Sequence, residues 1–390
     1  MDESARDRPV FRTVTDRLGQ PDSRRLIPTP ALVCDLDVLT DNIARMAALT
    51  ASSRIAIRPH VKSHKSAFVA RRQLDAGAVG LSCAKLAEAE MIVRRLIADG
   101  YERRISVLLT SPLVGAVAAE RVLALSGFCD PIVVVDNLEG VDELASAFGG
   151  AENGLGVLCD VDVGFARTGV VGPSQALQVV ERIEQDPHLH FGGVQGYGGH
   201  LQHIRGREER RSSTMESTRR LEEVVNALES RGHNVPLRTG GGTGTSALDV
   251  EIGLLNELQP GSYVFMDREY RDALGGDPEG WFGQSLTVAT TVISANQDGF
   301  VTVDAGLKAM ATDAGSPLVV GHEATASYHF FGDEHGLVTN GPDGPFRRGD
   351  RLDLVPPHCD PTVDRYDFMW LVRDDVVMGV ADVVARGCSQ

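Results

Sequence analysis

The chain has 390 residues, of which 42% are hydrophobic and 24% charged, enough to bury one large core or two moderate ones. The formal net charge of -16 repels nucleic-acid phosphates and anionic lipid surfaces, so we expect no nucleic-acid partner. The polar N-terminal stretch contains no apolar leader segment, and no later stretch reaches the roughly 18 consecutive apolar residues that a membrane span needs. These features predict a cytoplasmic enzyme without a membrane partner.

The cysteines are widely spaced and include no C-x-x-C pair. They are Cys34, Cys83, Cys129, Cys159, Cys359 and Cys388. This spacing argues against a disulfide scaffold and against a four-thiolate zinc site. We expect most of them to be small buried apolar residues.

Short apolar runs alternate with amphipathic stretches between residues 30 and 265. Continuous apolar runs of this kind are typical of buried parallel strands. The runs are residues 31–36, 54–57, 78–83, 105–110, 131–135, 155–159, 191–195, 235–238 and 262–265, which makes nine. Between them, residues 85–100 and 214–232 show apolar residues at helical spacing and end at a glycine.

A repeated strand-then-helix unit predicts an α/β fold, and eight such units close into a (β/α)8 TIM barrel with catalytic groups at the C-terminal ends of the strands. A doubly wound open sheet is the alternative. Its first unit normally carries a glycine-rich phosphate loop, and none follows residues 31–36. After about residue 266, apolar and polar residues alternate between Gly, Asp and Pro, which indicates a second, mostly β domain.

The motif RPHVKSHKS, residues 58–66, places Lys62 just after a predicted strand. A lysine there can be a solvated cation, a phosphate clamp or an amine for carbonyl chemistry. Because the motif follows a barrel strand, Lys62 is expected at the rim where reacting groups gather.

The segment RTGGGTGTS, residues 238–246, follows a late barrel strand. Its glycines, which include Gly241, Gly242 and Gly244, let backbone amides approach an anion, and Thr243 adds a hydroxyl donor. A flexible turn is the alternative, but the placement before a helix favours a phosphate cradle. A barrel with a phosphate cradle and a rim lysine indicates pyridoxal phosphate, with the lysine as its Schiff-base partner.

The segment LVPPHCDPTV, residues 354–363, contains an H-x-D pattern. In an extended segment, residues two apart point to the same side, so His358 and Asp360 can bind one cation while Cys359 points away. That donor pair suits Mn²⁺, Mg²⁺ or Zn²⁺ with open positions for water or substrate. On its own the pattern is also compatible with a surface turn.

The chain resembles the D-threonine aldolase and D-serine dehydratase group of fold-type III pyridoxal-phosphate enzymes. The resemblance covers roughly residues 29–387 and rests on TPALVCDLDVLTDNIARM, RPHVKSHKS, GLSCAKLAEAE, GGGTG, ELQPGSY, VDAGLKA, GDEHG and HCDPTV, in that order. It implies an alanine-racemase-like barrel over residues 38–265 and a β domain formed by residues 1–37 and 266–390. It also implies a homodimer, and it makes residues 262–265 the eighth barrel strand, which resolves the count of nine.

The resemblance assigns roles to individual residues. Lys62 matches the Schiff-base lysine, whereas Lys65 would be helical and structural. His60 and His64 would form pocket wall or a second layer. The remaining cofactor contacts would be Arg167 at the phenolic oxygen, Tyr197 at the ring nitrogen, and Thr239, Gly241, Gly242, Thr243, Gly244 and Tyr263.

His203 in GGHLQH would take or relay the proton of a substrate hydroxyl, with His200 or a metal-bound hydroxide as alternatives. A helix-end salt bridge is the alternative for Arg167.

The resemblance also implies which reaction is catalysed. Relatives that eliminate water from D-serine place a cysteine at the second metal-ligand position, whereas this chain has Asp360, which resembles the aldolase branch. We therefore expect cleavage of a D-β-hydroxy-α-amino acid, such as D-threonine or D-allo-threonine, to glycine and an aldehyde. The expected metal is Mn²⁺, with Mg²⁺, Co²⁺ and Zn²⁺ as alternatives. The alternative functions are a D-3-hydroxyaspartate aldolase, a D-serine or hydroxyaspartate dehydratase, and a non-catalytic pyridoxal-phosphate carrier.

Overall fold

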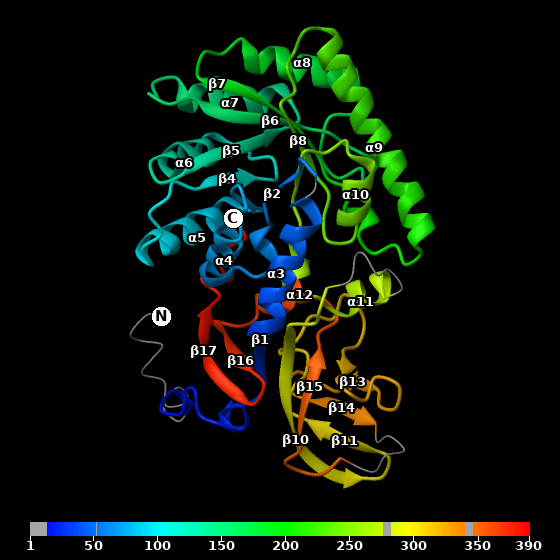
Figure 1. Cartoon of the computed structure of the whole chain (residues 1–390). Coiled ribbons are helices and arrows are strands. Elements are labelled where there is room, and N and C mark those ends of the chain that lie inside the picture. The colour runs from blue at the N-terminus through cyan, green and yellow to red at the C-terminus, as the bar shows by residue number, and fades with distance from the viewer. Residues whose placement is uncertain (1–13, 52, 276–281, 340–345) are drawn as a thin grey trace.

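The computed structural model describes residues 14–51, 53–275, 282–339 and 346–390. The polar N-terminal stretch was used to predict that no apolar leader is present. Its first 13 residues lie outside the described ranges. The chain forms two parts, a barrel in the upper half of Figure 1 and a β-rich domain below it. No helix among the described residues is long and apolar enough to cross a membrane.

The upper part is a parallel eight-stranded sheet in the order β2-β9-β8-β7-β6-β5-β4-β3. Its strands are β2 (Ala56–Ile57), β3 (Leu81–Cys83), β4 (Ser106–Leu109), β5 (Asp130–Val135), β6 (Leu155–Asp160), β7 (Leu189–Gly196), β8 (Leu237–Gly240) and β9 (Glu257–Leu258). A parallel bridge between His60 and Ser82 joins the ends of this order. The sheet therefore closes on itself, which confirms the predicted barrel fold.

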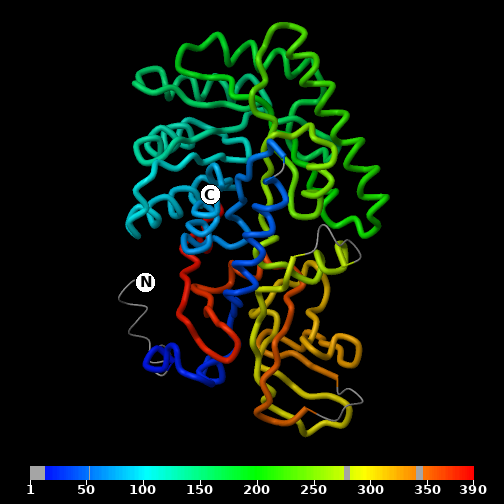
Figure 2. Tube along the Cα trace, viewed as in Figure 1, coloured from blue at the N-terminus to red at the C-terminus, as the bar shows by residue number. Residues whose placement is uncertain are grey.

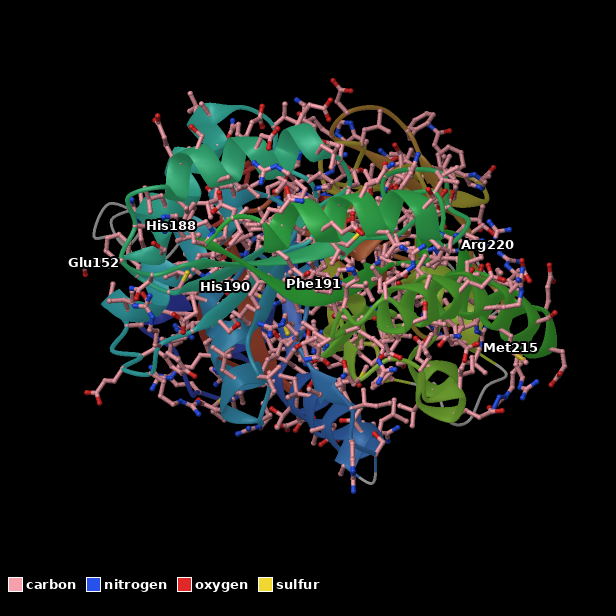
Figure 3. All side chains as sticks on the ribbon, turned by 90° about the horizontal axis from the view of Figure 1, so that it is seen from above. Glu152, His188, His190, Phe191, Met215 and Arg220 are labelled. Carbon is pink, nitrogen blue, oxygen red and sulfur yellow. The ribbon has the colours of Figure 1, made fainter. Side chains whose placement is uncertain are left out.

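A helix follows each of the strands β2 to β8, as expected for βα units. The helices are α4 (Ala67–Asp75), α5 (Leu86–Ala98), α6 (Ala116–Ser126), α7 (Leu138–Phe148), α8 (Pro173–Glu184), α9 (Arg207–Ser230) and α10 (Ser246–Ile252), with the short 3-10 turns η2 (Val61–Ser63) and η3 (Gly199–Leu201) at two strand ends. Viewed from above, α9 lies at the periphery with Met215 and Arg220 on its outer side (Figure 3). Its buried face includes Leu221, Val224 and Leu228.

Two local predictions were wrong. Residues 262–265 do not form the eighth strand, because Ser262–Val264 is the 3-10 turn η4, and the strand is the two-residue β9 that precedes it. Val264 and Phe265 are fully buried against the β domain, so their apolar character reflects a buried turn. Lys65 is not helical either, since it has a left-handed φ of 49° in the turn before α4.

The lower part contains a nine-stranded sheet in the order β13-β14-β11-β10-β1-β16-β17, with β15 pairing β10 and β12. Its strands are β1 (Ala31–Asp35), β10 (Leu286–Gln297), β11 (Phe300–Val303), β12 (Leu318–Val319), β13 (Tyr328–Phe330), β14 (Gly336–Thr339), β15 (Arg351–Val355), β16 (Phe368–Arg373) and β17 (Val376–Asp382). As the resemblance implies, β1 belongs to this sheet and pairs with β10 and β16.

One long and two short helices lie where the two parts meet. They are α3 (Leu36–Ala51), α11 (Arg268–Leu274) and α12 (Cys359–Val363), while η1 (Ser23–Leu26) lies beside β17. Figure 2 shows that the C-terminal segment leaves the β domain and returns to the barrel. There the backbone oxygen of Gln390 accepts the N–H of Ala87, at the start of α5. The cysteines are all unpaired, and those other than Cys388 are buried, as predicted.

Candidate active site

Lys62 lies in the 3-10 turn η2, which follows β2 at the C-terminal end of the barrel strands. His60 fixes this turn, because its Nδ1 accepts the backbone N–H of Lys62 at 3.4 Å and its Nε2 lies 3.1 Å from Thr110 Oγ1. Since Nδ1 is an acceptor, the proton of the neutral ring is on Nε2 and is donated to Thr110. Burial, followed by the charge of Lys62, holds the pKa of His60 well below its ordinary value. His60 is therefore a neutral wall of the site.

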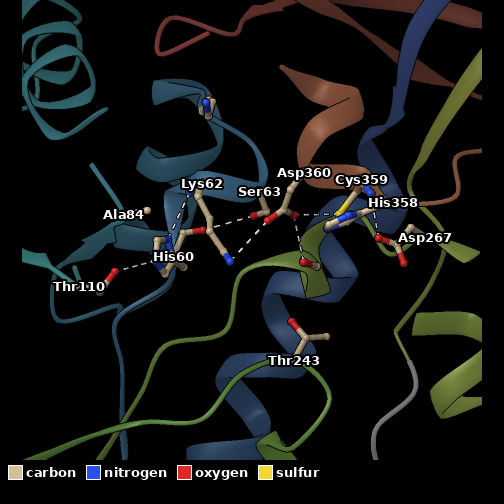
Figure 4. A network of polar contacts seen from close by, with 12 residues as sticks. His60, Lys62, Ser63, Ala84, Thr110, Thr243, Asp267, His358, Cys359 and Asp360 are labelled. Carbon is tan, nitrogen blue, oxygen red and sulfur yellow. Dashed lines mark hydrogen bonds and ion pairs between the residues drawn. The ribbon is translucent and has the colours of Figure 1, made fainter. Parts of the chain in front are cut away.

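The Lys62 amine faces a carboxylate from the β domain. Its Nζ lies 3.7 Å from Asp360 Oδ2, and the two side chains are 39% and 17% exposed (Figure 4). Burial lowers the pKa of Lys62, but Tyr197 and Asp360 raise it more, so the net shift is upward. Burial raises the pKa of Asp360, but Lys62 and His358 lower it more, so the net shift is downward. Both groups are therefore charged at neutral pH.

Tyr197 and Arg167 form another part of the pocket wall. The Tyr197 ring centroid lies 6.0 Å from Lys62 Nζ and 5.5 Å from Arg167 Cζ. Together with His60, Thr110 and neighbouring residues they line a pocket with a cavity volume of about 60 Å³. The pocket is open at one side, so it can admit a small molecule to the amine.

The loop that carries Arg167 is shaped by aspartates. Asp162 Oδ1 accepts the N–H groups of Gly164 and Ala166 at 2.9 and 3.0 Å. Asp160 Oδ2 accepts the hydroxyl of Thr168 at 2.8 Å. Arg167 is thus presented by a braced loop, and the structure shows no salt bridge for it among the described residues, so the helix-end alternative is not supported.

The glycine-rich loop lies between β8 and α10, as predicted. A Cβ at Gly241 would overlap the carboxylate of Asp249, and a Cβ at Gly244 would overlap the backbone oxygen of Gln202. Gly241 also has a left-handed φ of 65°. Only glycine fits these positions, because the loop packs directly on the Asp249 side chain and on the backbone of Gln202.

Side chains below the loop hold it in place. The N–H of Gly244 donates to Gln202 Oε1 at 2.9 Å, and the N–H of Gly242 donates to Thr245 Oγ1 at 3.2 Å. Thr243 Oγ1 accepts the backbone N–H of Tyr263 at 3.0 Å, so Thr243 keeps its hydroxyl proton for another acceptor. The loop is therefore preformed, although two of its glycine amides already donate hydrogen bonds within the protein.

Asp249 lies under this loop and accepts the Thr245 hydroxyl at 2.7 Å. Burial raises the pKa of Asp249 to about 7, although the Thr245 hydrogen bond acts against this shift. The folded protein therefore binds a proton here that the unfolded chain releases near pH 4, so this group makes the free energy of unfolding fall as pH rises from about 4 to about 7. In the wild type, this group should lower the free energy of unfolding by up to about 1.4 kcal/mol per pH unit in that range. We expect Asp249→Asn to abolish this contribution.

Urea denaturation of the wild type and Asp249→Asn at pH 5.5 and pH 8 measures this effect. The variant should gain stability relative to the wild type at the higher pH, because asparagine accepts the same hydrogen bond without a buried charge. Asp298→Asn, a change at an exposed position in the turn between β10 and β11, is the control. An identical pH dependence in the wild type and Asp249→Asn would contradict the buried-charge account.

Two predicted cofactor contacts direct their side chains elsewhere. The Thr239 hydroxyl donates to Glu257 Oε1 at 2.9 Å inside the barrel. The Tyr263 hydroxyl accepts a hydrogen bond from the side chain of Gln73, a residue of α4, at 3.0 Å. Tyr263 therefore contacts the loop through its backbone N–H, and its phenol is part of the core.

The other residues of RPHVKSHKS are structural. His64 Nε2 lies 3.2 Å from Gln73 Oε1, and burial lowers the pKa of His64 to about 4. Lys65 Nζ pairs with Asp364 at 2.7 Å and lies 3.9 Å from Glu88.

The H-x-D segment begins a helix and is not extended throughout, which corrects the local structure predicted for it. His358 is the extended N-cap residue, and Asp360 lies in the first turn of α12. Asp267 fixes this start, because its Oδ2 accepts the N–H of Cys359 at 2.8 Å and its Oδ1 accepts the N–H of Tyr270 at 3.0 Å. Figure 4 shows His358 and Asp360 on this turn, with Asp360 directed toward Lys62.

Asp267 was not singled out from the sequence. The signal that could have found it is an aspartate immediately before the helical stretch of α11, at the N-cap position. Its second role, holding α12, depends on a contact 92 residues away along the chain.

His203 lies near the metal-ligand pair, whereas His200 does not. His358, Asp360 and Lys62 all influence the pKa of His203, which burial, the largest effect, lowers below its ordinary value. Its Nε2 is buried without a hydrogen-bond partner among the described residues and lies 4.0 Å from Glu269 Oε2. The exposed ring of His200 instead stacks on Phe165 with a centroid distance of 5.5 Å. Of the two histidines, His203 is the one whose pKa is influenced by Lys62, His358 and Asp360.

The residues fit both groups expected from the sequence. An amine, a phenol and a guanidinium converge on one open pocket, and the nearby loop accepts only glycine, which suits pyridoxal phosphate. An imidazole and a carboxylate two residues apart suit a divalent cation. Among the described residues, no group of three or more His, Cys, Asp or Glu side chains is arranged to hold a metal.

Comparisons with known proteins cover nearly the whole chain. Residues 34–269 match the family "Alanine racemase, N-terminal domain", and residues 285–372 match a serine dehydratase domain family. The chain is 35% identical over 367 residues to a 3-hydroxy-D-aspartate aldolase of Paracoccus denitrificans (93% of this chain, 92% of that protein). It is also 35% identical over 373 residues to a D-threonine aldolase of an Arthrobacter species (95% and 96%).

Solved structures give a consistent result. The D-threonine aldolase of Filomicrobium marinum superposes with a TM-score of 0.90 and 32% identity, covering 96% of this chain and 99% of that chain. The D-threo-3-hydroxyaspartate dehydratase of Delftia sp. HT23 gives a TM-score of 0.81 and 25% identity, covering 92% and 98%. A cysteine-to-alanine mutant of such a dehydratase was solved in a metal-free form.

Proposed function

The chain belongs to the alanine racemase N-terminal domain family, and from this premise we propose that it is a pyridoxal-phosphate-dependent aldolase that cleaves D-β-hydroxy-α-amino acids to glycine and an aldehyde. The observation that carries the proposal is the 3.7 Å approach of Lys62 Nζ to Asp360 Oδ2. It brings the barrel amine and the H-x-D motif of the β domain within ion-pair distance of each other. A pyridoxal-phosphate carrier would need neither the motif nor the β domain.

Lys62 would bind the aldehyde of pyridoxal phosphate, with Tyr197 and Arg167 beside the ring and the Gly241–Gly244 loop at the phosphate. When bound, this cofactor supplies an electron-withdrawing ring that accepts the electron pair of the breaking Cα–Cβ bond. Tyr197 is a phenol and not a carboxylate, so it would hold the ring nitrogen without a full negative charge. Arg167 and Lys62 place two positive charges near Tyr197, which suits an anionic ligand in this pocket.

His358 and Asp360 would hold a divalent cation, which we propose to be Mn²⁺. Such a cation supplies a Lewis acid that lowers the pKa of the substrate hydroxyl. The Asp360 carboxylate is well suited to this role, because its lowered pKa keeps it ionised and its Oδ1 also accepts the Ser262 hydroxyl at 3.3 Å.

His203 would accept the hydroxyl proton of the substrate. Its lowered pKa keeps the ring neutral at pH 7, as a proton acceptor requires. Glu269, 4.0 Å from Nε2, would stabilise the positive charge that the ring gains. The pair therefore provides both an acceptor and a compensating charge on the metal side of the pocket.

D-3-hydroxyaspartate is the second candidate substrate, because an aldolase named for it is as similar in sequence, at 35% identity, as a D-threonine aldolase. We also propose a cytoplasmic homodimer. Exposed apolar side chains at the barrel rim, namely Val114, Phe165 and Val171, support a subunit contact near the mouth. Light scattering in solution tests the dimer.

We expect the purified holoenzyme with Mn²⁺ to release glycine from D-threonine and D-allo-threonine and to leave both L forms intact. Lys62 and the two metal ligands would hold the amine and the hydroxyl of the substrate at fixed positions, so only one configuration at Cα should fit, whereas a single cation contact discriminates weakly between the two configurations at Cβ. Chromatography of glycine and acetaldehyde measures the products. Release of ammonia and a keto acid would indicate the dehydratase alternative, and comparable turnover of L-threonine would contradict the proposal.

A further inference from the structure

Asp313 contacts the imidazole of His358 from a different part of the β domain. It lies in the turn between β11 and β12, and its Oδ2 is 2.7 Å from His358 Nδ1. Asp313 is 45 residues away in sequence, and no motif marks it. The contact is short enough for a charge-assisted hydrogen bond.

This contact decides which ring nitrogen can bind a cation. A carboxylate accepts hydrogen bonds and donates none, so the proton of the pair lies on Nδ1. A neutral His358 then carries its lone pair on Nε2. Metal-binding histidines commonly donate the other ring N–H to a carboxylate, which fixes the tautomer and the ring orientation.

The turn that carries Asp313 is tied to α12. The N–H of Ala311 donates to Thr362 Oγ1 at 3.0 Å, and the same hydroxyl donates to the backbone oxygen of His358 at 2.7 Å. On the other side of Asp313, the backbone oxygen of Ser316 accepts from Arg268 at 2.6 Å. The carboxylate is therefore held in place relative to the ring, even though its side chain is 57% exposed.

The other carboxylates near His358 have different partners. Asp267 accepts the backbone amides of Tyr270 and Cys359, and Asp360 faces Lys62. Among the described residues, Asp313 is the carboxylate that hydrogen-bonds the His358 ring.

We propose that Asp313 is a positioning residue of the metal site, which holds His358 in the tautomer whose Nε2 faces the cation. The inference rests on the proposed function, because that function supplies the cation. Asp313 acts through His358 and does not touch the substrate.

The test is direct Mn²⁺ binding, which does not depend on turnover. Free Mn²⁺ is measured by electron paramagnetic resonance during titration of the holoenzyme and its variants. Asp313→Ala is expected to weaken binding by about 10- to 100-fold. Asp313→Asn should bind more tightly than Asp313→Ala, because the amide oxygen still accepts the Nδ1–H. The visible absorbance of the bound cofactor should not change in either variant.

Asp298→Ala is the matched control, since it removes one exposed carboxylate of the same domain in the turn between β10 and β11. It should bind Mn²⁺ like the wild type. A second measurement uses ¹⁵N-histidine spectra of the Zn²⁺-loaded protein, in which wild-type His358 should show a protonated Nδ1 and a metal-bound Nε2. Asp313→Ala should show a mixture of tautomers.

The outcomes separate the two proposals. Unchanged Mn²⁺ affinity in Asp313→Ala, with binding abolished in His358→Ala, would overturn the role of Asp313 and leave the metal site intact. No Mn²⁺ binding by the wild type would instead contradict the proposed function. An equal loss of Mn²⁺ affinity in Asp298→Ala would mean that any surface carboxylate has this effect, and it would also overturn the inference.

Discussion

Lys62→Ala is expected to purify without the visible absorbance of a lysine-bound cofactor and to lose cleavage of D-threonine by on the order of 10⁴-fold or more. Lys62 provides the amine at the mouth of the barrel pocket, and it lies between Tyr197 and Asp360. Borohydride reduction of the wild type should fix the cofactor on the peptide that contains Lys62. Mass spectrometry of the digested protein measures the site of attachment.

Two further variants separate chemistry from folding. Lys62→Arg keeps a positive charge next to Asp360 but cannot bond to the aldehyde, so it should fold and remain inactive. Lys85→Ala changes an exposed lysine at the start of α5 and should keep both absorbance and activity. Label on Lys65 or Lys85 would show that the cofactor-binding lysine was assigned wrongly.

The barrel could be predicted from sequence because its strands are buried on both faces and therefore appear as continuous apolar runs. The eighth strand could not, because β9 has only two residues and the adjacent run at residues 262–265 is equally apolar. That run is apolar because Val264 and Phe265 pack against the β domain, and a short apolar run does not distinguish a strand from a buried turn. The left-handed turn at Lys65 was also missed, and its ion pairs with Asp364 and Glu88 join residues that are distant in sequence.

Site residues could be predicted from sequence where they lie in short sequence motifs. Lys62, His358 and Asp360 lie in short motifs, whereas Asp313 and Glu269 reach the site through folding and carry no local signal. The extended conformation expected for the H-x-D segment was wrong, because Asp267 caps Cys359 and starts a helix there. The two predicted ligands still lie together, since an N-cap residue and a residue in the first turn can face one side of a short helix.

Removal of the metal is expected to stop catalysis while leaving the cofactor bound. The cation would have two protein ligands, so its affinity should be modest and a chelator should remove it, unlike a closed four-ligand zinc site. Loss of a Lewis acid worth several kcal/mol corresponds to a decrease in rate of on the order of 10³-fold. Treatment with EDTA, absorbance of the cofactor and assay of glycine release measure both parts, and Mn²⁺ should restore the rate.

Asp360→Ala should reproduce the chelated state, and it also removes the carboxylate beside Lys62. Because Asp360 is one of the groups that raise the pKa of the free Lys62 amine, the variant should also lower that pKa, which chelation of the wild type does not do. Ser262→Ala, which removes only the hydroxyl bonded to Asp360 Oδ1, is the matched control and should keep most of the activity. Asp360→Cys should shift metal preference toward Zn²⁺, because a thiolate is a softer ligand. Cleavage of D-threonine at the full rate by Asp360→Ala or by the chelated enzyme would show that the metal does not take part in the reaction. Only the proposed role of Lys62 and the cofactor would then remain.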